Sequence, residues 1–133
     1  MKETTMDINI DGKDYSLAFN LNVMEAIQAE YKTIDEWGAL TESGAIVEEK
    51  KDKKGNVLDV KRTGETDIKA LVFGFTEMIN EGMDIKAEEA GEVWKPLTKK
   101  AVARLISKYG FENAFMEMQK TMIESTADEE KNA

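Results

Sequence analysis

The sequence has 133 residues, 41% of them hydrophobic and 34% charged, which fits one domain with a modest core. Its net charge of -9 argues against nucleic acid and anionic membranes as partners, because both attract a basic protein surface. No apolar run approaches the roughly 20 residues that span a bilayer. The first residues lack the apolar core of a signal peptide and cysteine is absent, so we expect a cytoplasmic protein.

Histidine is also absent from the sequence. Its absence removes the commonest general base, the usual metal ligand, and the histidine partner of Ser and Cys nucleophiles. Glu88, Glu89 and Glu92 are close enough to hold a hard cation, but no second acidic cluster accompanies them, which favours a solvated face. We therefore expect a protein that is not an enzyme and needs no metal or cofactor.

The chain opens with a pattern typical of a β-hairpin. Apolar and polar residues alternate from Met6 to Ile10 and again from Asp14 to Phe19, with Asp11-Gly12 between the two runs. An Asp-Gly pair between alternating runs is a good hairpin signal. The side chains predicted to face the core are Ile8, Ile10, Tyr15, Leu17 and Phe19.

Two short helices are predicted next. Asn22, followed by Glu25, suits the N-cap of a first helix that ends near Tyr31. Thr33 with Glu36 repeats this pattern before a second helix whose apolar residues are Ile34, Trp37 and Leu40. Trp37 is either a core residue or an exposed anchor for a partner, because tryptophan is enriched at binding hot spots.

The segment from Thr41 to Glu65 is dominated by charge. A run of seven charged residues, 48–54, is followed by Gly55-Asn56 and flanked by short apolar stretches. This pattern predicts either a second hairpin over residues 45–62 with a polar tip, or a mobile excursion of the chain. The mixed signs argue against a nucleic-acid patch, and the spacing of ligands argues against a calcium loop.

The segment from Thr66 to Gly82 predicts the central helix, capped by Thr66 at its start and ended by Gly82. Phe73 lies off the main apolar stripe, so we expect other elements to cover this helix from two sides. The stripe consists of Ile68, Leu71, Val72, Phe75, Met78 and Ile79.

The remaining chain predicts three further helices. A short one spans about Ile85 to Trp94, and Pro96 separates it from a helix that is capped by Thr98 and ended by Gly110. Phe111 opens the last helix, whose inward face holds Ala114, Phe115, Met118 and Met122 as well.

Met116 and Ile123 lie on a different side of that last helix, seven positions apart. This side is either buried, simply exposed, or left free for a partner, and methionine suits adaptable binding surfaces. With Trp37, these two residues are the candidate partner-binding residues.

The predicted fold is α+β, a mainly helical single domain with an N-terminal β-hairpin. The domain spans residues 1–124, includes the charged hairpin or excursion at 45–62, and is followed by a flexible acidic tail at 125–133.

The order of these elements resembles the tail assembly chaperones of long-tailed phages and prophages, particularly those of Gram-positive hosts. The similarity is carried by DINIDGKDYSLAFNLNVMEAIQAEY, by the helix end MINEG and by LTKKAVARLISKYG. It runs from about Asp7 to about Ile123, and the charged segment from Thr41 to Glu65 is not matched.

The resemblance implies a non-enzymatic protein that binds the long helical tape measure protein before the tail tube polymerises around it. Such chaperones keep that protein soluble, help to recruit the tail tube protein, and leave before the virion is complete. For this chain, the chaperone hypothesis also predicts weak self-association along the partner. Two other classes stay open. One is a structural phage protein, such as a minor tail or head-tail joining component. The other is an unrelated acidic module that binds a basic partner.

Overall fold

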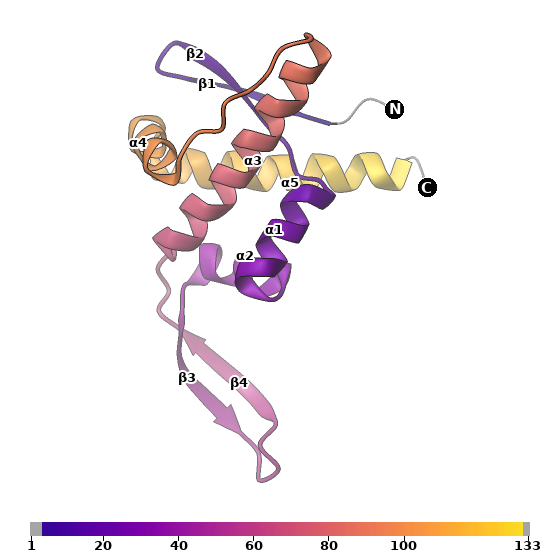
Figure 1. Cartoon of the computed structure of the whole chain (residues 1–133). Coiled ribbons are helices and arrows are strands. Elements are labelled where there is room, and N and C mark those ends of the chain that lie inside the picture. Colours follow the sequence, from indigo (N-terminus) through magenta and orange to yellow (C-terminus); the bar gives the residue numbers. More distant parts are fainter. Residues whose placement is uncertain (1–3, 132–133) are drawn as a thin grey trace.

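The structure, a computed structural model, describes the backbone of residues 4–131 and the side chains of residues 4–126. This part of the chain forms an α+β domain, mainly helical, with a β-hairpin at its N-terminal end (Figure 1). Two antiparallel hairpins, β1–β2 and β3–β4, accompany the helices. In chain order the elements are β1 (Met6–Ile10), β2 (Lys13–Leu17), α1 (Leu21–Tyr31), α2 (Ile34–Ser43), β3 (Ile46–Lys51), β4 (Val57–Arg62), α3 (Ile68–Glu89), α4 (Lys99–Tyr109) and α5 (Phe111–Lys131).

Helix α3 forms the centre of the domain, and β2, α1, α2, α4 and α5 all pack against it (Figure 1). Phe73 is buried beside the main stripe, which confirms that the helix is covered from more than one side. Ile68, predicted to be buried, is exposed because it begins the helix at the edge of the core. The N-cap is Asp67 and not Thr66, since the Asp67 carboxylate accepts a hydrogen bond of 2.9 Å from the backbone N–H of Ala70.

The prediction that Gly82 ends the central helix is wrong. The helix continues to Glu89, and Gly82 is buried where the backbone of β2 crosses it. A Cβ at this position would collide with the carbonyl oxygen of Ser16 and lie 2.8 Å from the carbonyl carbon of Leu17. Glycine is therefore needed here for close packing of two backbones.

The short helix predicted from Ile85 to Trp94 does not exist as a separate element. Ile85 is buried as part of the last turns of α3, which ends at Glu89 with Ala90 as its C-cap. Gly91 follows with a positive φ of 72°, a conformation that glycine adopts freely. The chain then runs without regular structure to Thr98, so the helix break lies several residues after Gly82.

The N-terminal hairpin matches its prediction. Its two strands pair from Met6 opposite Leu17 to Ile10 opposite Lys13. The turn residues Asp11 and Gly12 both have positive φ, 53° and 84°, as a tight hairpin turn requires. All five side chains predicted to face the core are buried: Ile8, Ile10, Tyr15, Leu17 and Phe19.

Helix α1 begins two residues earlier than the sequence pattern suggested. The side-chain oxygen of Asn20 accepts the capping hydrogen bond from the N–H of Val23, at 3.3 Å. Asn22, the predicted cap, lies inside the helix and its amide donates to Glu81 on α3 at 3.3 Å. Two asparagines two residues apart offer two possible starts, and the packing of the preceding strand on α3 selects the first.

The other predicted caps are confirmed. The hydroxyl of Thr33 accepts from the N–H of Glu36 at 3.0 Å, and that of Thr98 accepts from the N–H of Ala101 at 3.1 Å. Gly110 separates α4 from α5 with a φ of 102°. No helix within residues 4–131 is both long and apolar enough to cross a membrane.

Helix α5 extends further than predicted, through Lys131, so the expected flexible tail at 125–133 begins in the structure as helix. Ser125 is buried on the same face as Ala114, Met118 and Thr121. This face combines apolar and small polar residues at helical spacing, and the sequence pattern missed its last part because Thr and Ser are not apolar. Phe111, predicted to face inward, is partly exposed. Residues 132–133 lie outside the described residues.

Replacing Gly82 with alanine tests the close packing of β2 on α3. The added Cβ would collide with the backbone of β2, so we expect Gly82→Ala to lower the free energy of unfolding by at least about 2 kcal/mol. Gly38→Ala in α2 is the matched control, because outside the local backbone of its own helix no atom lies within 4 Å of its Cβ position. The control should be neutral or stabilising by about 0.5–1 kcal/mol. Equal midpoints of urea unfolding for the two variants would contradict this packing.

Candidate protein-binding surfaces

The first candidates for a chemical site, among the residues that the structure describes, are titratable side chains. No group of three or more His, Cys, Asp or Glu side chains that could hold a metal ion occurs among them. Burial raises the pKa of Tyr31, helped by the charges of Asp67 and Glu30, and burial also raises the pKa of Tyr109. These two tyrosines lie on different helices and serve the packing of the domain. The exposed apolar side chains of α5 and of the β3–β4 hairpin are the candidate contacts for another protein.

Trp37 lies in the core, with only 1% of its surface exposed. Its indole N–H donates a hydrogen bond of 2.9 Å to the backbone carbonyl of Ala70. The ring lies so close to α3 that a Cβ at Gly74 would come within 2.8 Å of the indole Cε2 atom. The interpretation of Trp37 as an exposed anchor for a partner is therefore wrong, because the side chain fixes α2 against α3.

Met116 and Ile123 are exposed on α5, with 59% and 63% of their surfaces accessible. They lie about 10 Å apart along the helix axis, and the exposed Lys120 lies between them in the sequence. Isolated apolar residues of this kind are common on protein surfaces. Their role as partner contacts stays a prediction, and the α5 surface offers only a small apolar area.

The β3–β4 hairpin presents a larger exposed apolar surface. It extends away from the helices (Figure 1), and every residue of β3 and all but the last of β4 are exposed. The second-hairpin alternative for residues 45–62 is thus confirmed. The strands expose 38–69% of five apolar side chains, Ile46, Val47, Val57, Leu58 and Val60. The sequence showed these apolar residues on both sides of the charge cluster. Their exposure could not be predicted from it, because it depends on how the hairpin projects from the helices.

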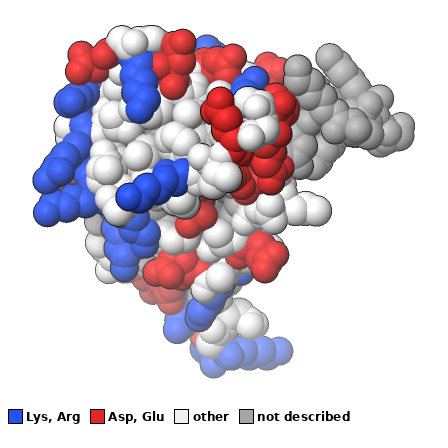
Figure 2. Space-filling view, turned by 45° about the horizontal axis from the view of Figure 1, so that its top comes forward, with Lys and Arg blue, Asp and Glu red and all other residues white. Residues whose placement is uncertain are grey.

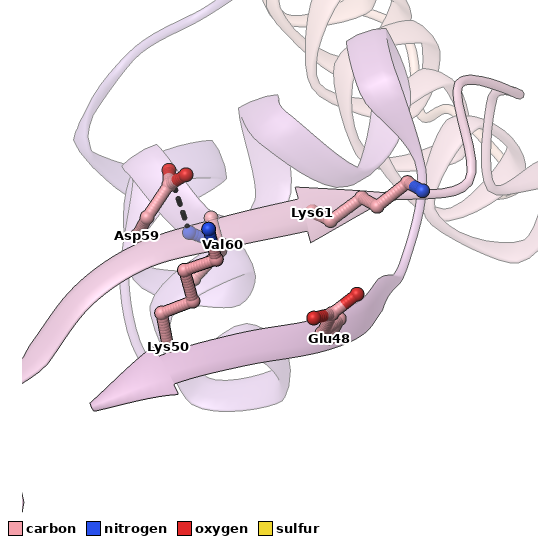
Figure 3. A pocket seen from close by; sticks show the side chains of 5 residues that line it. All are labelled: Glu48, Lys50, Asp59, Val60 and Lys61. Carbon is pink, nitrogen blue, oxygen red and sulfur yellow. Dashed lines mark hydrogen bonds between the residues drawn. The ribbon is translucent and has the colours of Figure 1, made fainter.

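One face of this hairpin carries alternating charges. The register places Glu48 opposite Lys61 and Lys50 opposite Asp59, so these four side chains share a face. Figure 3 shows Glu48 and Lys50 rising from β3, with Asp59 and Lys61 on β4. Together with Val60, these four residues line an open depression of about 360 Å³, and its lining contains two acidic and two basic side chains. Opposite charges in facing positions stabilise the pairing of the two strands.

Strand alternation gives the hairpin a second, more apolar side. Leu58 and Val60 alternate with Asp59 and Lys61 along β4, so their side chains point to the opposite side. Arg62, at the base of β4, points to the same side as Leu58 and Val60. The outer part of this side therefore presents Leu58 and Val60 to solvent. Beside them lie Glu49 and Lys51, which form an ion pair of 3.6 Å on the facing strand.

The base of the hairpin is tied to the helical body. The guanidinium of Arg62 donates to the Glu36 carboxylate at 3.0 Å and to the carbonyl of Gly44 at 2.8 Å. The Arg62 side chain is 15% exposed, so this ion pair is shielded better than a surface pair. Backbone hydrogen bonds from Thr63 to Ala45 and from Gly64 to Ser43 close the base. The hairpin thus projects from a defined anchor.

The tip of the hairpin is closed by Asp52. Its carboxylate accepts hydrogen bonds of 2.9 Å from the backbone N–H groups of Lys54 and Asn56, and a third from the Asn56 amide. The hydrogen bond from the Asn56 backbone, followed by weaker ones, holds the pKa of Asp52 below its usual range. This residue is a turn cap, which explains its place in the charge cluster.

Charge is distributed unevenly over the molecule. Residues 46–62 contain six basic and four acidic residues, which gives them a net charge of +2. Because the total net charge is -9, the remaining residues together carry -11. Four lysines surround the tip at positions 50, 51, 53 and 54. Figure 2 shows basic side chains at the end of the hairpin and on the side formed by α4, with acidic side chains grouped elsewhere. The projecting hairpin and α4 are thus two basic parts of a protein whose net charge is negative.

Comparisons with known proteins do not assign the chain to a family. No protein-family model, no curated protein and no solved structure matches it significantly.

Trp37→Phe should destabilise the protein without affecting a surface that binds partners. The change removes the hydrogen bond to Ala70 and leaves a void beside Gly74, so we expect a loss of about 1–3 kcal/mol in unfolding free energy. Trp94→Phe is the matched control, because Trp94 is only partly buried and its acceptor, the Asn80 side-chain oxygen, keeps its bond to the N–H of Leu97. Urea unfolding followed by the remaining tryptophan measures both. A larger loss for Trp94→Phe would contradict the central position of Trp37.

Acidification should open the tip of the hairpin. Because the pKa of Asp52 is lowered in the folded turn, its ionised form stabilises the turn at pH values above the usual Asp range, and this effect is lost as the pH falls through the lowered pKa. We expect the amide NMR signals of Lys54 and Asn56 to shift together in this acidic window. In Asp52→Asn the joint shift should disappear. Titration of both signals at the usual pKa of aspartate would show that the cap does not form.

Proposed function

We propose that this protein is a tail assembly chaperone of a long-tailed phage or prophage, which binds the tape measure protein in the host cytoplasm and assists assembly of the tail tube. The observation that supports this function best is the projecting β3–β4 hairpin, which exposes five apolar side chains on a domain of negative net charge. Clustered exposed apolar side chains are typical of surfaces that bind other proteins. The specific role is suggested by the sequence resemblance from about Asp7 to Ile123, which does not include the segment from Thr41 to Glu65 that contains this hairpin.

The physical demands of this role fit the chain. A long helical protein that awaits assembly exposes apolar stripes that would otherwise aggregate, and an apolar hairpin can cover part of such a stripe. The net charge of -11 outside the hairpin keeps a complex soluble through mutual repulsion. Neither task requires a catalytic group. Recruitment of the tail tube protein and weak self-association along the partner belong to the same proposal.

The acidic body also favours a second candidate, a module that binds a compact basic protein. In that case the contact surface would be the acidic helical body, and long helical proteins would not bind. A third possibility, a structural component of the phage tail, differs in its fate, because it would stay in purified virions whereas a chaperone would leave.

Co-expression tests the proposed function directly. With this chain tagged and the tape measure protein of the neighbouring gene untagged, we expect the long protein to become soluble and to co-purify. Met116→Asp combined with Ile123→Asp reports whether the α5 surface takes part in the contact. An insoluble long protein with nothing co-purifying would overturn the proposal. Mass spectrometry of purified virions completes the test, since abundant chain in the virion would favour the structural component.

A further inference from the structure

We infer that the apolar side of the β3–β4 hairpin docks an amphipathic helix whose apolar stripe is flanked by acidic side chains. This inference adds to the proposed function the surface that contacts the partner and the kind of helix that this surface binds. It rests on the proposed function only for the existence of a partner.

Exposure shows that the hairpin has a free side. Leu58 is 69% exposed, and Val47 and Val57 are 60% and 52% exposed, although β-branched and leucine side chains normally stabilise a sheet by packing against another layer. A two-stranded hairpin on its own is at best marginally stable in water. Within residues 4–126 no other element covers these side chains. A partner that covers them would gain apolar burial and would stabilise the hairpin.

The strand edges argue for a partner that lies across the side of the hairpin and against a partner that adds a strand. The register shifts twice, between Ile46 and Glu48 and between Lys50 and Lys51, and such bulges interrupt the regular edge that strand addition needs. The N–H of Val60 is held at 2.9 Å by the carboxylate of Asp59, its own neighbour. An α-helix satisfies its own backbone hydrogen bonds and needs only side-chain contacts, so it suits this surface better.

The positive charge at the hairpin tip favours a partner helix with acidic side chains on both sides of its apolar stripe. Lys50, Lys51, Lys53 and Lys54 surround the tip, and the hairpin carries +2 against -11 for the remaining chain. A strand of six residues extends about 20 Å, which exceeds the screening length of about 8 Å at physiological salt. The lysines at the tip therefore act largely independently of the acidic body. They attract acidic side chains beside the apolar stripe of a partner, whereas a basic helix would be repelled.

Two synthetic peptides test this selectivity. Both are amphipathic, about 20 residues long and share one Leu/Ile stripe, which is flanked by Glu in the first and by Lys in the second. Fluorescence anisotropy with the full chain at about 0.15 M salt should show the Glu peptide binding about tenfold more tightly than the Lys peptide. Equal binding, tighter binding of the Lys peptide, or no binding of either peptide would overturn the inference.

Variants of the hairpin locate the contact. Leu58→Asp should weaken binding of the Glu peptide about tenfold, and Leu58→Thr, which keeps a high strand propensity, should also weaken it. The pair Lys53→Glu and Lys54→Glu should remove the preference for the Glu peptide. Val93→Asp, in the segment between α3 and α4, is the control and should bind like the unchanged chain, because Val93 is fully exposed and lies outside the hairpin. Because Leu58 lies outside the core, far-UV circular dichroism and the melting temperature should stay unchanged.

Other occupants of the hairpin give distinct results. A dimer in sedimentation experiments that Leu58→Asp abolishes would show that a second copy covers the apolar side, and would overturn the inference. Duplex DNA that displaces the Glu peptide and depends on Lys53 and Lys54 would overturn it as well. Failure of the tape measure protein to co-purify, with the peptide results as expected, would reject the proposed function and leave the docking surface intact.

Discussion

The domain depends on the close contact of α3 with two other parts of the chain. At Gly82 the backbone of β2 lies directly on the helix, and the N–H of Ala18 donates a hydrogen bond of 3.0 Å to the carbonyl of Met78 nearby. At Gly74 the ring of Trp37 lies on the helix in the same way. Both contacts bring backbone or ring atoms within reach of the helix because no Cβ intervenes. The N-terminal hairpin and α2 are thereby fixed relative to one central element.

This arrangement leaves the β3–β4 hairpin outside the core. The hairpin connects α2 to α3, and the contact between those helices through Trp37 brings its two ends together at the surface of the body. Arg62 then anchors the base through Glu36 and the Gly44 carbonyl. Since the core is complete without the hairpin, its strands are free to carry exposed apolar and basic side chains. A surface for a partner can therefore change in sequence at little cost to the stability of the domain.

Short sequence patterns correctly predicted turns and helix caps. The Asp11-Gly12 turn and the caps at Thr33 and Thr98 formed as expected, because a turn or a cap is decided by the conformation of a few neighbouring residues. The pattern failed where glycine and small polar residues serve packing. Gly82 resembles a helix end and is a contact point, and Ser125 resembles the start of a tail and is buried on α5.

By itself the sequence determined the fold class, the N-terminal hairpin, the central helix and the acidic character of the chain, because periodicity and composition encode them directly. Only the tertiary structure decided which apolar residues are available to a partner. Trp37 and Leu58 are both apolar residues beside charged ones, yet one is buried against α3 and the other projects into solvent. The difference depends on whether another element lies over each side chain, and contacts between distant segments of the chain determine that.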